Sequence, residues 1–167
     1  MTVPQKKKPQ IPNRRHTMAP RLPHIPLPYR ILLLWFEPLA ALNGAILCHF
    51  NPVLFLDTMT AKAVFAPSHQ VIFDQLSATY TLFAFNEAVV LRITKDLKVW
   101  KAMVFGMLLC DLIHLYGSWS VMGPQVFLDP TLWRAGDALN LAMLYVPIMM
   151  RLSFLMEIGF KKEGKIE

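Results

Sequence analysis

Asp111 and His114 stand three residues apart in a long apolar segment, a spacing that places both side chains on one face of a helix. A carboxylate beside an imidazole can fix the tautomer of the ring and raise its basicity. In a dry environment the same pair can deliver or accept a proton. A structural hydrogen-bonded pair would have the same spacing, so the sequence leaves catalysis and helix packing open for these two residues.

Three more ionisable residues, Glu37, Glu87 and Arg151, interrupt other apolar segments. A charged side chain in the middle of a membrane helix costs roughly 2.5–3.5 kcal/mol on insertion scales, so each must face a partner or a cavity. The depth of Arg151 in its segment suits pairing with Glu37 or Glu87. We interpret this pairing first as a structural tie, and we keep both acids as candidate catalytic groups beside Asp111 and His114.

Uncharged and acidic polar residues complete the candidate set. Asn86 and Asn140 are typical of hydrogen bonds between membrane helices, and they can also orient a bound substrate. Asp137 shares a helical face with Asn140 and Arg151. The sequence predicts no metal and no cofactor, because a single histidine among scattered carboxylates lacks the spacing of metal ligands.

Four apolar blocks must position these residues. The chain has 167 residues, of which 54% are hydrophobic and 17% charged, against roughly 45–50% and about 25% in soluble domains. The blocks, each about as long as the roughly 20 residues that cross a bilayer core, cover residues 31–50, 71–91, 99–121 and 133–156. We therefore predict an all-α fold, a bundle of four transmembrane helices over residues 31–157.

Lysine and arginine predict the orientation of this bundle. Seven lie in residues 1–30, four in residues 92–101 and four from Arg151 onward, whereas the other two connections hold only Lys62 and Arg134. This asymmetry places both termini in the cytoplasm. It also accounts for the net charge of +6 without a nucleic-acid partner, so we expect the lipid bilayer and no nucleic acid.

The two ends of the chain differ from the apolar blocks. Residues 1–30 contain seven prolines, seven basic residues and no acid, which predicts a disordered basic cytoplasmic tail. Residues 158–167 form a second, shorter basic tail.

Four short motifs resemble those of a known family: Leu27–Pro28–Tyr29–Arg30, Phe36–Glu37–Pro38, Phe85–Asn86–Glu87 and Asp111–Leu112–Ile113–His114–Leu115–Tyr116. Together, over about residues 27–157, they resemble a fungal family of small four-span membrane proteins of uncharacterised domain type. Members of that family are often encoded beside secondary-metabolite genes, which implies a multi-pass protein of the endoplasmic reticulum near lipophilic intermediates. The resemblance assigns no residue a role.

Three functions remain open at this point. The number of ionisable residues within the spans favours an acid–base isomerase or cyclase that acts within the bilayer, by analogy with membrane isomerases and cyclases that use acids and a histidine in a helical bundle. The basic tail and short connections favour a non-catalytic protein that anchors other membrane-bound pathway enzymes or binds a hydrophobic intermediate. A transporter or channel component fits less well, because no inverted repeat is visible.

Overall fold

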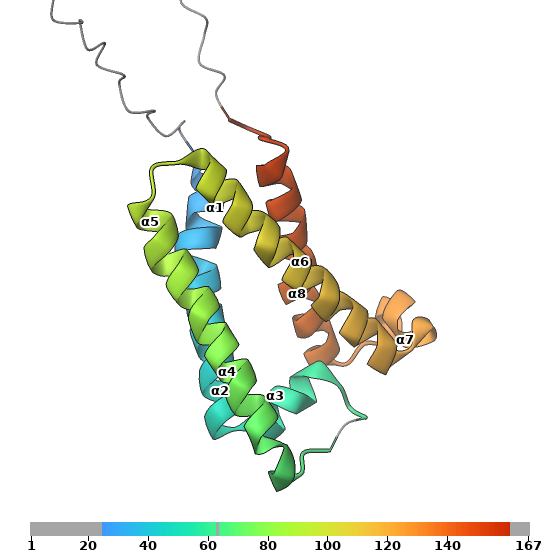
Figure 1. Cartoon of the computed structure of the whole chain (residues 1–167). Helices are drawn as coiled ribbons and strands as arrows, with labels where there is room; N and C mark the ends of the chain where they lie inside the picture. The colour runs from blue at the N-terminus through green and yellow to red at the C-terminus, as the bar shows by residue number, and fades with distance from the viewer. Residues whose placement is uncertain (1–24, 63, 161–167) are drawn as a thin grey trace, which may run out of the picture.

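The computed structural model describes residues 25–62 and 64–160, and its regular elements there are all helical (Figure 1), which confirms the predicted all-α class. The predictions for residues 1–24 and 161–167, which cover most of the two basic tails, lie outside the described residues.

The first long helical segment consists of α1 (Leu27–Ile31), the π-helical turn η1 (Leu32–Phe36) and α2 (Glu37–Phe50). It begins four residues before the predicted start at residue 31. Pro28 does not prevent this, because it lies in the first turn, where a backbone N–H would have no helical partner.

The second part of the chain begins with α3 (Pro52–Met59) and continues through the 3-10 turn η2 (Pro67–His69) into α4 (Gln70–Phe85), the π-helical turn η3 (Asn86–Val90) and α5 (Leu91–Ile93). The α3 helix is started by the side chain of Asn51, which accepts a hydrogen bond of 3.1 Å from the backbone N–H of Leu54.

The third and fourth segments are α6 (Leu97–Met122), α7 (Pro124–Leu128), the 3-10 turn η4 (Pro130–Leu132) and α8 (Ala135–Leu155). Gly123 ends α6 in a conformation with φ of 82°, which glycine adopts without the steric cost of a side chain. Pro147 lies inside α8 and removes one helical hydrogen bond from it.

Three helical segments are long and apolar enough to cross a membrane, namely Leu27–Phe50, Leu97–Met122 and Ala135–Leu155. The sequence analysis predicted four. The segment from Gln70 to Ile93 is long enough, but Asp74, Gln75, Asn86 and Glu87 lower its mean hydropathy. The outer faces of the three apolar helices expose large side chains such as Ile113 and Met149, which are 72% and 62% exposed, as expected for surfaces that contact lipid.

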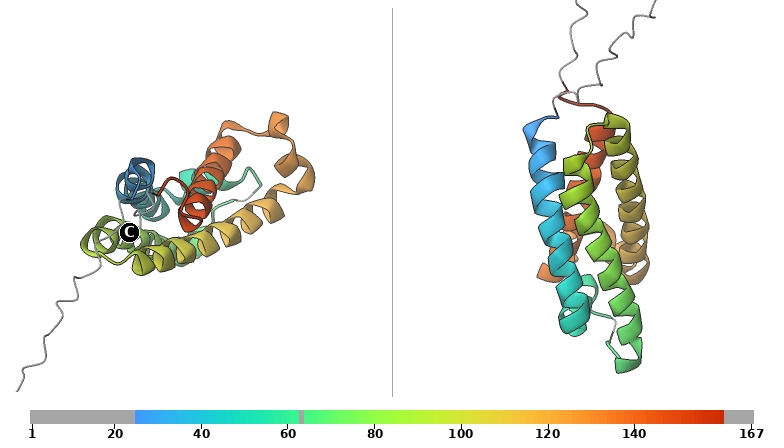
Figure 2. Two further views of the ribbon diagram at one scale, coloured as in Figure 1. Left: turned by 90° about the horizontal axis from the view of Figure 1, so that it is seen from above. Right: turned by 60° about the vertical axis from the view of Figure 1, so that its left-hand side comes forward.

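The long helices associate as two pairs (Figures 1 and 2). The α2 helix packs along α4, and α6 packs along α8. The pairs approach each other at the end of the bundle where α1 and α5 lie, here called the α1 end. They separate toward the opposite end, here called the α3 end.

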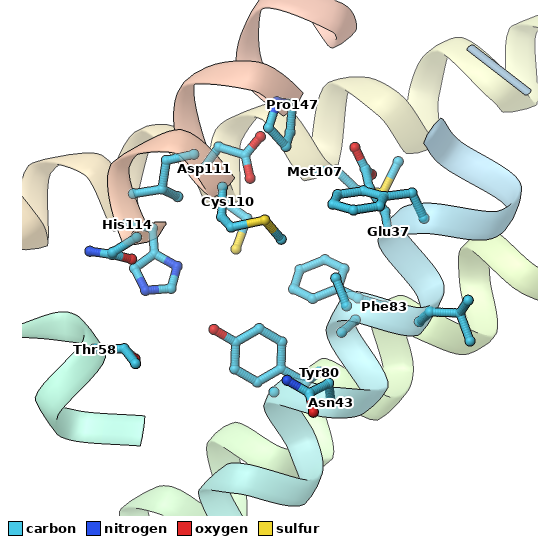
Figure 3. A pocket seen from close by; sticks show the side chains of 18 of the residues that line it. Glu37, Asn43, Thr58, Tyr80, Phe83, Met107, Cys110, Asp111, His114 and Pro147 are labelled. Atoms are coloured by element: carbon cyan, nitrogen blue, oxygen red, sulfur yellow. The ribbon is translucent and has the colours of Figure 1, made fainter. Parts of the chain in front are cut away.

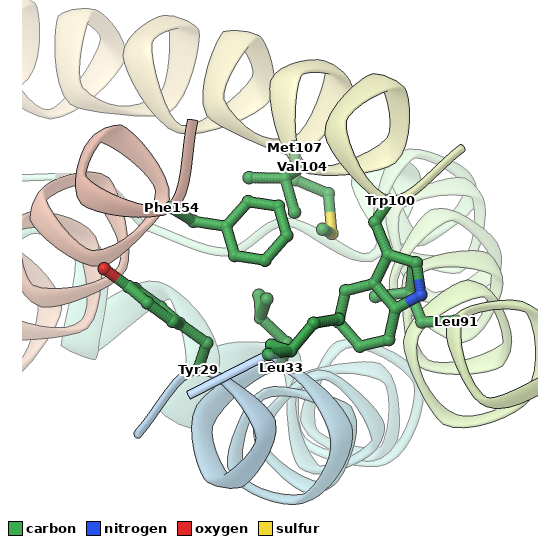
Figure 4. Close-up of a cluster of buried hydrophobic side chains, with 8 residues drawn as sticks. Tyr29, Leu33, Leu91, Trp100, Val104, Met107 and Phe154 are labelled. Carbon is green, nitrogen blue, oxygen red and sulfur yellow. The ribbon is translucent and has the colours of Figure 1, made fainter. Parts of the chain in front are cut away.

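A cluster of buried apolar side chains joins the two pairs at the α1 end (Figure 4). Phe154 lies at its centre, edge-on to Tyr29 with ring centroids 5.4 Å apart and stacked on Trp100 at 5.9 Å. Leu33 and Val104 are almost inaccessible within it. The hydroxyl of Tyr29 donates a hydrogen bond of 2.9 Å to the carbonyl of Ile158, which ties the start of the described chain to its end.

The α3 helix joins the two pairs at the other end. Arg134 donates to the Asp57 carboxylate at 3.1 Å and to the Asp57 carbonyl at 3.0 Å, and it also pairs with Asp137 at 3.0 Å. These hydrogen bonds, that with Asp137 first, raise the pKa of Arg134. Gly136 lets the α3 backbone approach, since a Cβ there would lie 3.3 Å from the Asp57 carbonyl oxygen.

Candidate functional site

A cavity of about 670 Å³ lies between the two helix pairs (Figure 3). Its lining is mostly apolar, and it follows α2 from Glu37 to Leu47, ten residues or about 15 Å at the rise of an α-helix. This volume falls in the range of small-molecule sites, about 300–1,000 Å³. The polar groups of the lining gather toward the two ends of this length.

At the end of the cavity nearer to α1, Arg151 contacts three carboxyl groups. Its Nη2 lies 2.5 Å from Glu37 Oε2 and 3.6 Å from Glu87 Oε1, and its Nη1 donates a hydrogen bond to Asp111 Oδ2. The four residues come from α2, η3, α6 and α8, one from each long helical segment. Glu37, Glu87 and Arg151 are buried, and Asp111 is half-buried. We call these four residues the Arg151 cluster.

The Arg151 cluster has one positive group for three carboxyls, so it carries two negative charges in excess whenever all three carboxyls are ionised. Uncompensated charge inside a membrane protein is costly, and carboxylates that share a site repel one another. A proton bound to one of these carboxyl groups reduces the excess negative charge. The Arg151 cluster lies at the wall of an apolar cavity.

Two side-chain atoms of the Arg151 cluster are buried without a hydrogen-bond partner in the described chain, Glu37 Oε1 and Arg151 Nε. One is an acceptor when the carboxyl is ionised, and the other is always a donor. Buried polar atoms are normally paired, and unpaired ones occur where a site has a chemical role or binds water or a ligand.

A π-helical turn directly precedes Glu37 in the first long helical segment. Pro38 has no backbone N–H and so leaves the carbonyl of Leu34 without its helical partner. The helix accommodates this by the turn η1, which ends directly before Glu37, and Arg92 donates to the Leu34 carbonyl at 2.5 Å. The guanidinium of Arg92 also lies 4.2 Å from the ring centre of Trp35. The side chain from the neighbouring segment thus stabilises the irregular turn.

The second π-helical turn, η3, contains Glu87 itself and packs against η1. Single π-helical turns inside α-helices occur frequently at functional sites. Both of these turns lie at an acidic residue of the Arg151 cluster. The sequence analysis did not predict them; Pro38 was the available signal for η1, whereas no proline or glycine marks η3.

Neutral polar residues gather at the end of the cavity nearer to α3. In Figure 3 the hydroxyl of Tyr80 and the ring of His114 point into the space that Thr58 borders from α3. Asn43 and Asn140 also line the cavity. Tyr80, Thr58 and Asn43 were not among the predicted site residues, because hydroxyl and amide side chains are common in membrane helices and carry no distinctive spacing.

The structure separates the predicted Asp111–His114 pair. Asp111 is bonded to Arg151, and within residues 25–62 and 64–160 no hydrogen bond joins it to His114. Both side chains line the same cavity. The predicted pairing of Arg151 with Glu37 or Glu87 is found with both acids, and Asp111 joins them as a third partner.

The remaining predicted residues fall in different places. Asn140 lines the cavity and donates to the Ser118 hydroxyl at 3.2 Å, which joins α8 to α6. Asp137 does not line the cavity and instead accepts hydrogen bonds from Arg134 at the start of α8. Asn86 is half-buried outside the cavity lining. In the described part of the chain, no three His, Cys, Asp or Glu residues are arranged to hold a metal ion.

Comparison with known proteins places the chain in a family without giving it a function. No curated protein and no solved structure matches it. Residues 20–161 match the model of a domain of unknown function, DUF7704. This match includes every residue of the cavity lining and extends over the range 27–157 in which the sequence motifs suggested a family of uncharacterised domain type. The chain therefore belongs to the DUF7704 family.

Proposed function

We propose that this protein is a membrane enzyme that isomerises or cyclises a lipophilic small molecule by proton transfer within the bilayer. The observation that carries the proposal is the Arg151 cluster, a set of carboxyl groups with too few positive charges at the wall of an apolar cavity. A protonated carboxyl in such surroundings is a general acid, and an ionised one is a general base.

The proposed reaction requires no second reactant. A carboxyl of the cluster gives its proton to one carbon of a carbon–carbon double bond, and the electron pair of that double bond forms the new C–H bond. A base in the cavity then removes a proton from a carbon next to the cationic centre, and the electrons of that C–H bond form the shifted double bond. In a cyclase, another double bond of the same molecule attacks the cationic centre before the proton is lost.

Five residues have the chemistry and the place for these steps. Glu37, Glu87 and Asp111 are the candidate acids, and Arg151 holds them together and stabilises whichever carboxyl is ionised. His114 lies in the same lining about one turn along α6 from Asp111 and is the candidate second base. Oε1 of Glu37 is an acceptor without a partner in the described chain, so it can hold a proton that the cluster takes up.

A second function is favoured by one specific observation. Arg151 engages Glu37, Glu87 and Asp111 at once, as a structural tie between four helical segments would. In that case the protein binds a hydrophobic intermediate in the cavity without transforming it, as an accessory to other membrane-bound enzymes. The two functions differ in whether a product appears.

We also propose four membrane crossings with both termini on the cytoplasmic side. Supporting this, the segment Gln70–Ile93 is long enough to span and packs along α2, and its polar residue Glu87 is buried against Arg151. The distribution of lysine and arginine supports the orientation. The resemblance to fungal proteins encoded beside secondary-metabolite genes supports the endoplasmic reticulum and a lipophilic pathway.

The test compares the metabolites of a producing host with and without the protein. One precursor should be converted when the wild-type chain or Glu157→Gln is present, since Glu157 pairs with Lys101 outside the cavity lining. Conversion should be lost with Glu87→Gln and with His114→Ala at equal protein accumulation. Equal conversion by Glu87→Gln and the wild type contradicts the proposed chemistry. A precursor that purifies with the protein and is never converted supports the accessory function.

A further inference from the structure

The cavity is closed along the helix axes at both of its ends. At the α1 end the cluster around Phe154, Trp100 and Leu33 fills the space between the two helix pairs. At the α3 end the helix α3 covers the space, and its residues Phe55 and Thr58 belong to the lining. A molecule that travels from the aqueous phase along the bundle axis would have to displace one of these two closures.

The side of the cavity between α2 and α8 is different, because lining residues there are also exposed. Leu39 on α2 is 64% exposed and Leu139 on α8 is 56% exposed. The lining residues of the opposite wall, such as Phe83 on α4 and Cys110 on α6, are only half-exposed or less. Leu39 and Leu139 are apolar and exposed, so the gap between α2 and α8 connects the cavity with the surface that faces lipid.

The polar groups near α3 indicate what such a molecule carries. Tyr80, Thr58 and His114 come from three different helices and converge on one end of an otherwise apolar space (Figure 3). Thr58 donates to the carbonyl of Phe55 at 2.6 Å and keeps its oxygen as an acceptor, whereas Tyr80 makes no hydrogen bond within the described chain. No full charge lies among these three groups at neutral histidine, so they suit an uncharged oxygen function.

We propose that the occupant is an elongated, lipid-dissolved molecule with one hydroxyl or carbonyl group, which enters sideways between α2 and α8. It lies along the helices for about 15 Å, with its oxygen at Tyr80 and Thr58 and its far end at the Arg151 cluster. This inference rests on the proposed function only for the view that the cavity is the substrate site, and it concerns binding rather than turnover.

The test uses photolabelling of the full chain in phosphatidylcholine nanodiscs. The probes are dodecanol, dodecane and dodecanoic acid, each with a diazirine on the chain. We expect the alcohol to label cavity residues more strongly than the alkane or the acid. Tyr80→Phe, or Thr58→Val if the first variant does not fold, should lower labelling by the alcohol about threefold to tenfold, the value of one hydrogen bond, and leave labelling by the alkane unchanged.

The route of entry is tested with Leu39→Trp, which places a large ring at the gap, against Leu42→Trp on the same helix. Leu42 is 42% exposed and does not line the cavity, so only the first variant should slow labelling. Equal labelling by alcohol and alkane, adducts confined to residues outside the cavity, or equal rates in the two tryptophan variants overturns the inference. Because photolabelling needs no turnover, selective labelling without product contradicts only the proposed catalysis.

Discussion

Arg151 is the residue on which both the structure and the proposed chemistry depend. It is buried, it comes from α8, and its three acidic partners come from the other three long helical segments. A buried ion pair adds little stability compared with an apolar pair, but removal of one partner leaves an uncompensated charge. The effect of losing Arg151 should therefore be much larger than its hydrogen bonds alone suggest.

We predict that Arg151→Met lowers the free energy of unfolding by about 3–5 kcal/mol, because Glu37, Glu87 and Asp111 lose their only cationic partner in the described part of the chain. Unfolding by sodium dodecyl sulfate in mixed micelles measures this. Addition of Glu37→Gln and Glu87→Gln to the same variant should restore part of the loss, since neutral amides need no counter-charge. If Glu37→Gln and Glu87→Gln lower the free energy of unfolding of the Arg151→Met variant further, the loss does not come from uncompensated negative charge.

The sequence predicted part of this cluster. The depth of Arg151, Glu37 and Glu87 in their segments was enough to pair them, because the basic flanks fix where each segment begins. It was not enough to choose the partner of Asp111. His114 on the same helical face was the nearest candidate along the chain, and only the packing of α6 on α8 brings Arg151 close to Asp111 instead.

At the scale of helical elements, the two π-helical turns lie at two acids of the Arg151 cluster, η1 directly before Glu37 and η3 around Glu87. Pro38 has no backbone N–H to donate to the Leu34 carbonyl, and this carbonyl accepts a hydrogen bond from Arg92 instead, which favours the turn η1. A π-helical turn contains one residue more than a regular α-helical turn, and one residue corresponds to a rotation of about 100° around the helix axis. If η1 became regular, the helix after it would rotate relative to the helix before it, and the side chain of Glu37 would point in another direction.

We predict that Pro38→Ala reduces product formation at least tenfold at unchanged protein accumulation. The new backbone N–H competes with Arg92 for the Leu34 carbonyl and favours a regular α-helix, which moves Glu37 from Arg151. Metabolite analysis of the expressing host measures it. The matched control is Pro52→Ala. Pro52 is the first residue of α3, where a backbone N–H has no helical acceptor, so the new N–H changes no helical hydrogen bond. Equal loss in both variants argues against a role of η1.

The contact of α3 with α8 gives a second prediction at this scale. Gly136→Ala should lower the free energy of unfolding by about 1–3 kcal/mol, because its Cβ would lie 3.3 Å from the Asp57 carbonyl oxygen and 3.4 Å from Thr58 Cα. Gly117→Ala on α6 is the control, since nothing lies within 4 Å of its Cβ, and it should be neutral or stabilise by up to about 1 kcal/mol. Micelle unfolding distinguishes them, and similar values for both would show that α3 does not dock closely on Gly136.

The helices themselves were largely visible in the sequence, while their irregularities were not. Apolar blocks of about 20 residues predicted the long helices to within a few residues at most ends. The helix α3 was expected to be part of a connection, because its eight residues are too few to show a pattern, and Asn51 and Pro52 also suit a loop. The turn η3 packs against η1, and no proline or glycine in the sequence marks it.

For the whole molecule, the number of crossings is the feature on which sequence and structure differ. Three segments satisfy the length and hydropathy expected of a span, and Gln70–Ile93 does not. The residues that make it polar include Glu87, which is buried inside the bundle and does not face lipid. Mean hydropathy counts every face of a helix alike, so the buried Glu87 lowers the mean as much as the partly exposed Asp74 does.

We predict that Gln70–Ile93 crosses the membrane. Single cysteines introduced at Thr94 and at Thr2 should react with a membrane-impermeant maleimide from the cytoplasmic side, and one introduced at Thr131 should react only from the opposite side. The parent for these variants is a chain with Cys48 and Cys110 replaced by alanine. Reaction of Thr2 and Thr94 from opposite sides would contradict the prediction, since the segments Leu27–Phe50 and Gln70–Ile93 lie between them and two crossings return the chain to the same side.

The central claim is that the Arg151 cluster transfers a proton to a lipophilic molecule, and incorporation of deuterium tests it most directly. Membranes of the producing host are supplied with the accumulated precursor in deuterated water, with the wild-type chain, with Glu87→Gln or without the protein. The account predicts one deuterium at a carbon of the product with the wild-type chain only. Product without deuterium, or equal incorporation with Glu87→Gln, would contradict it.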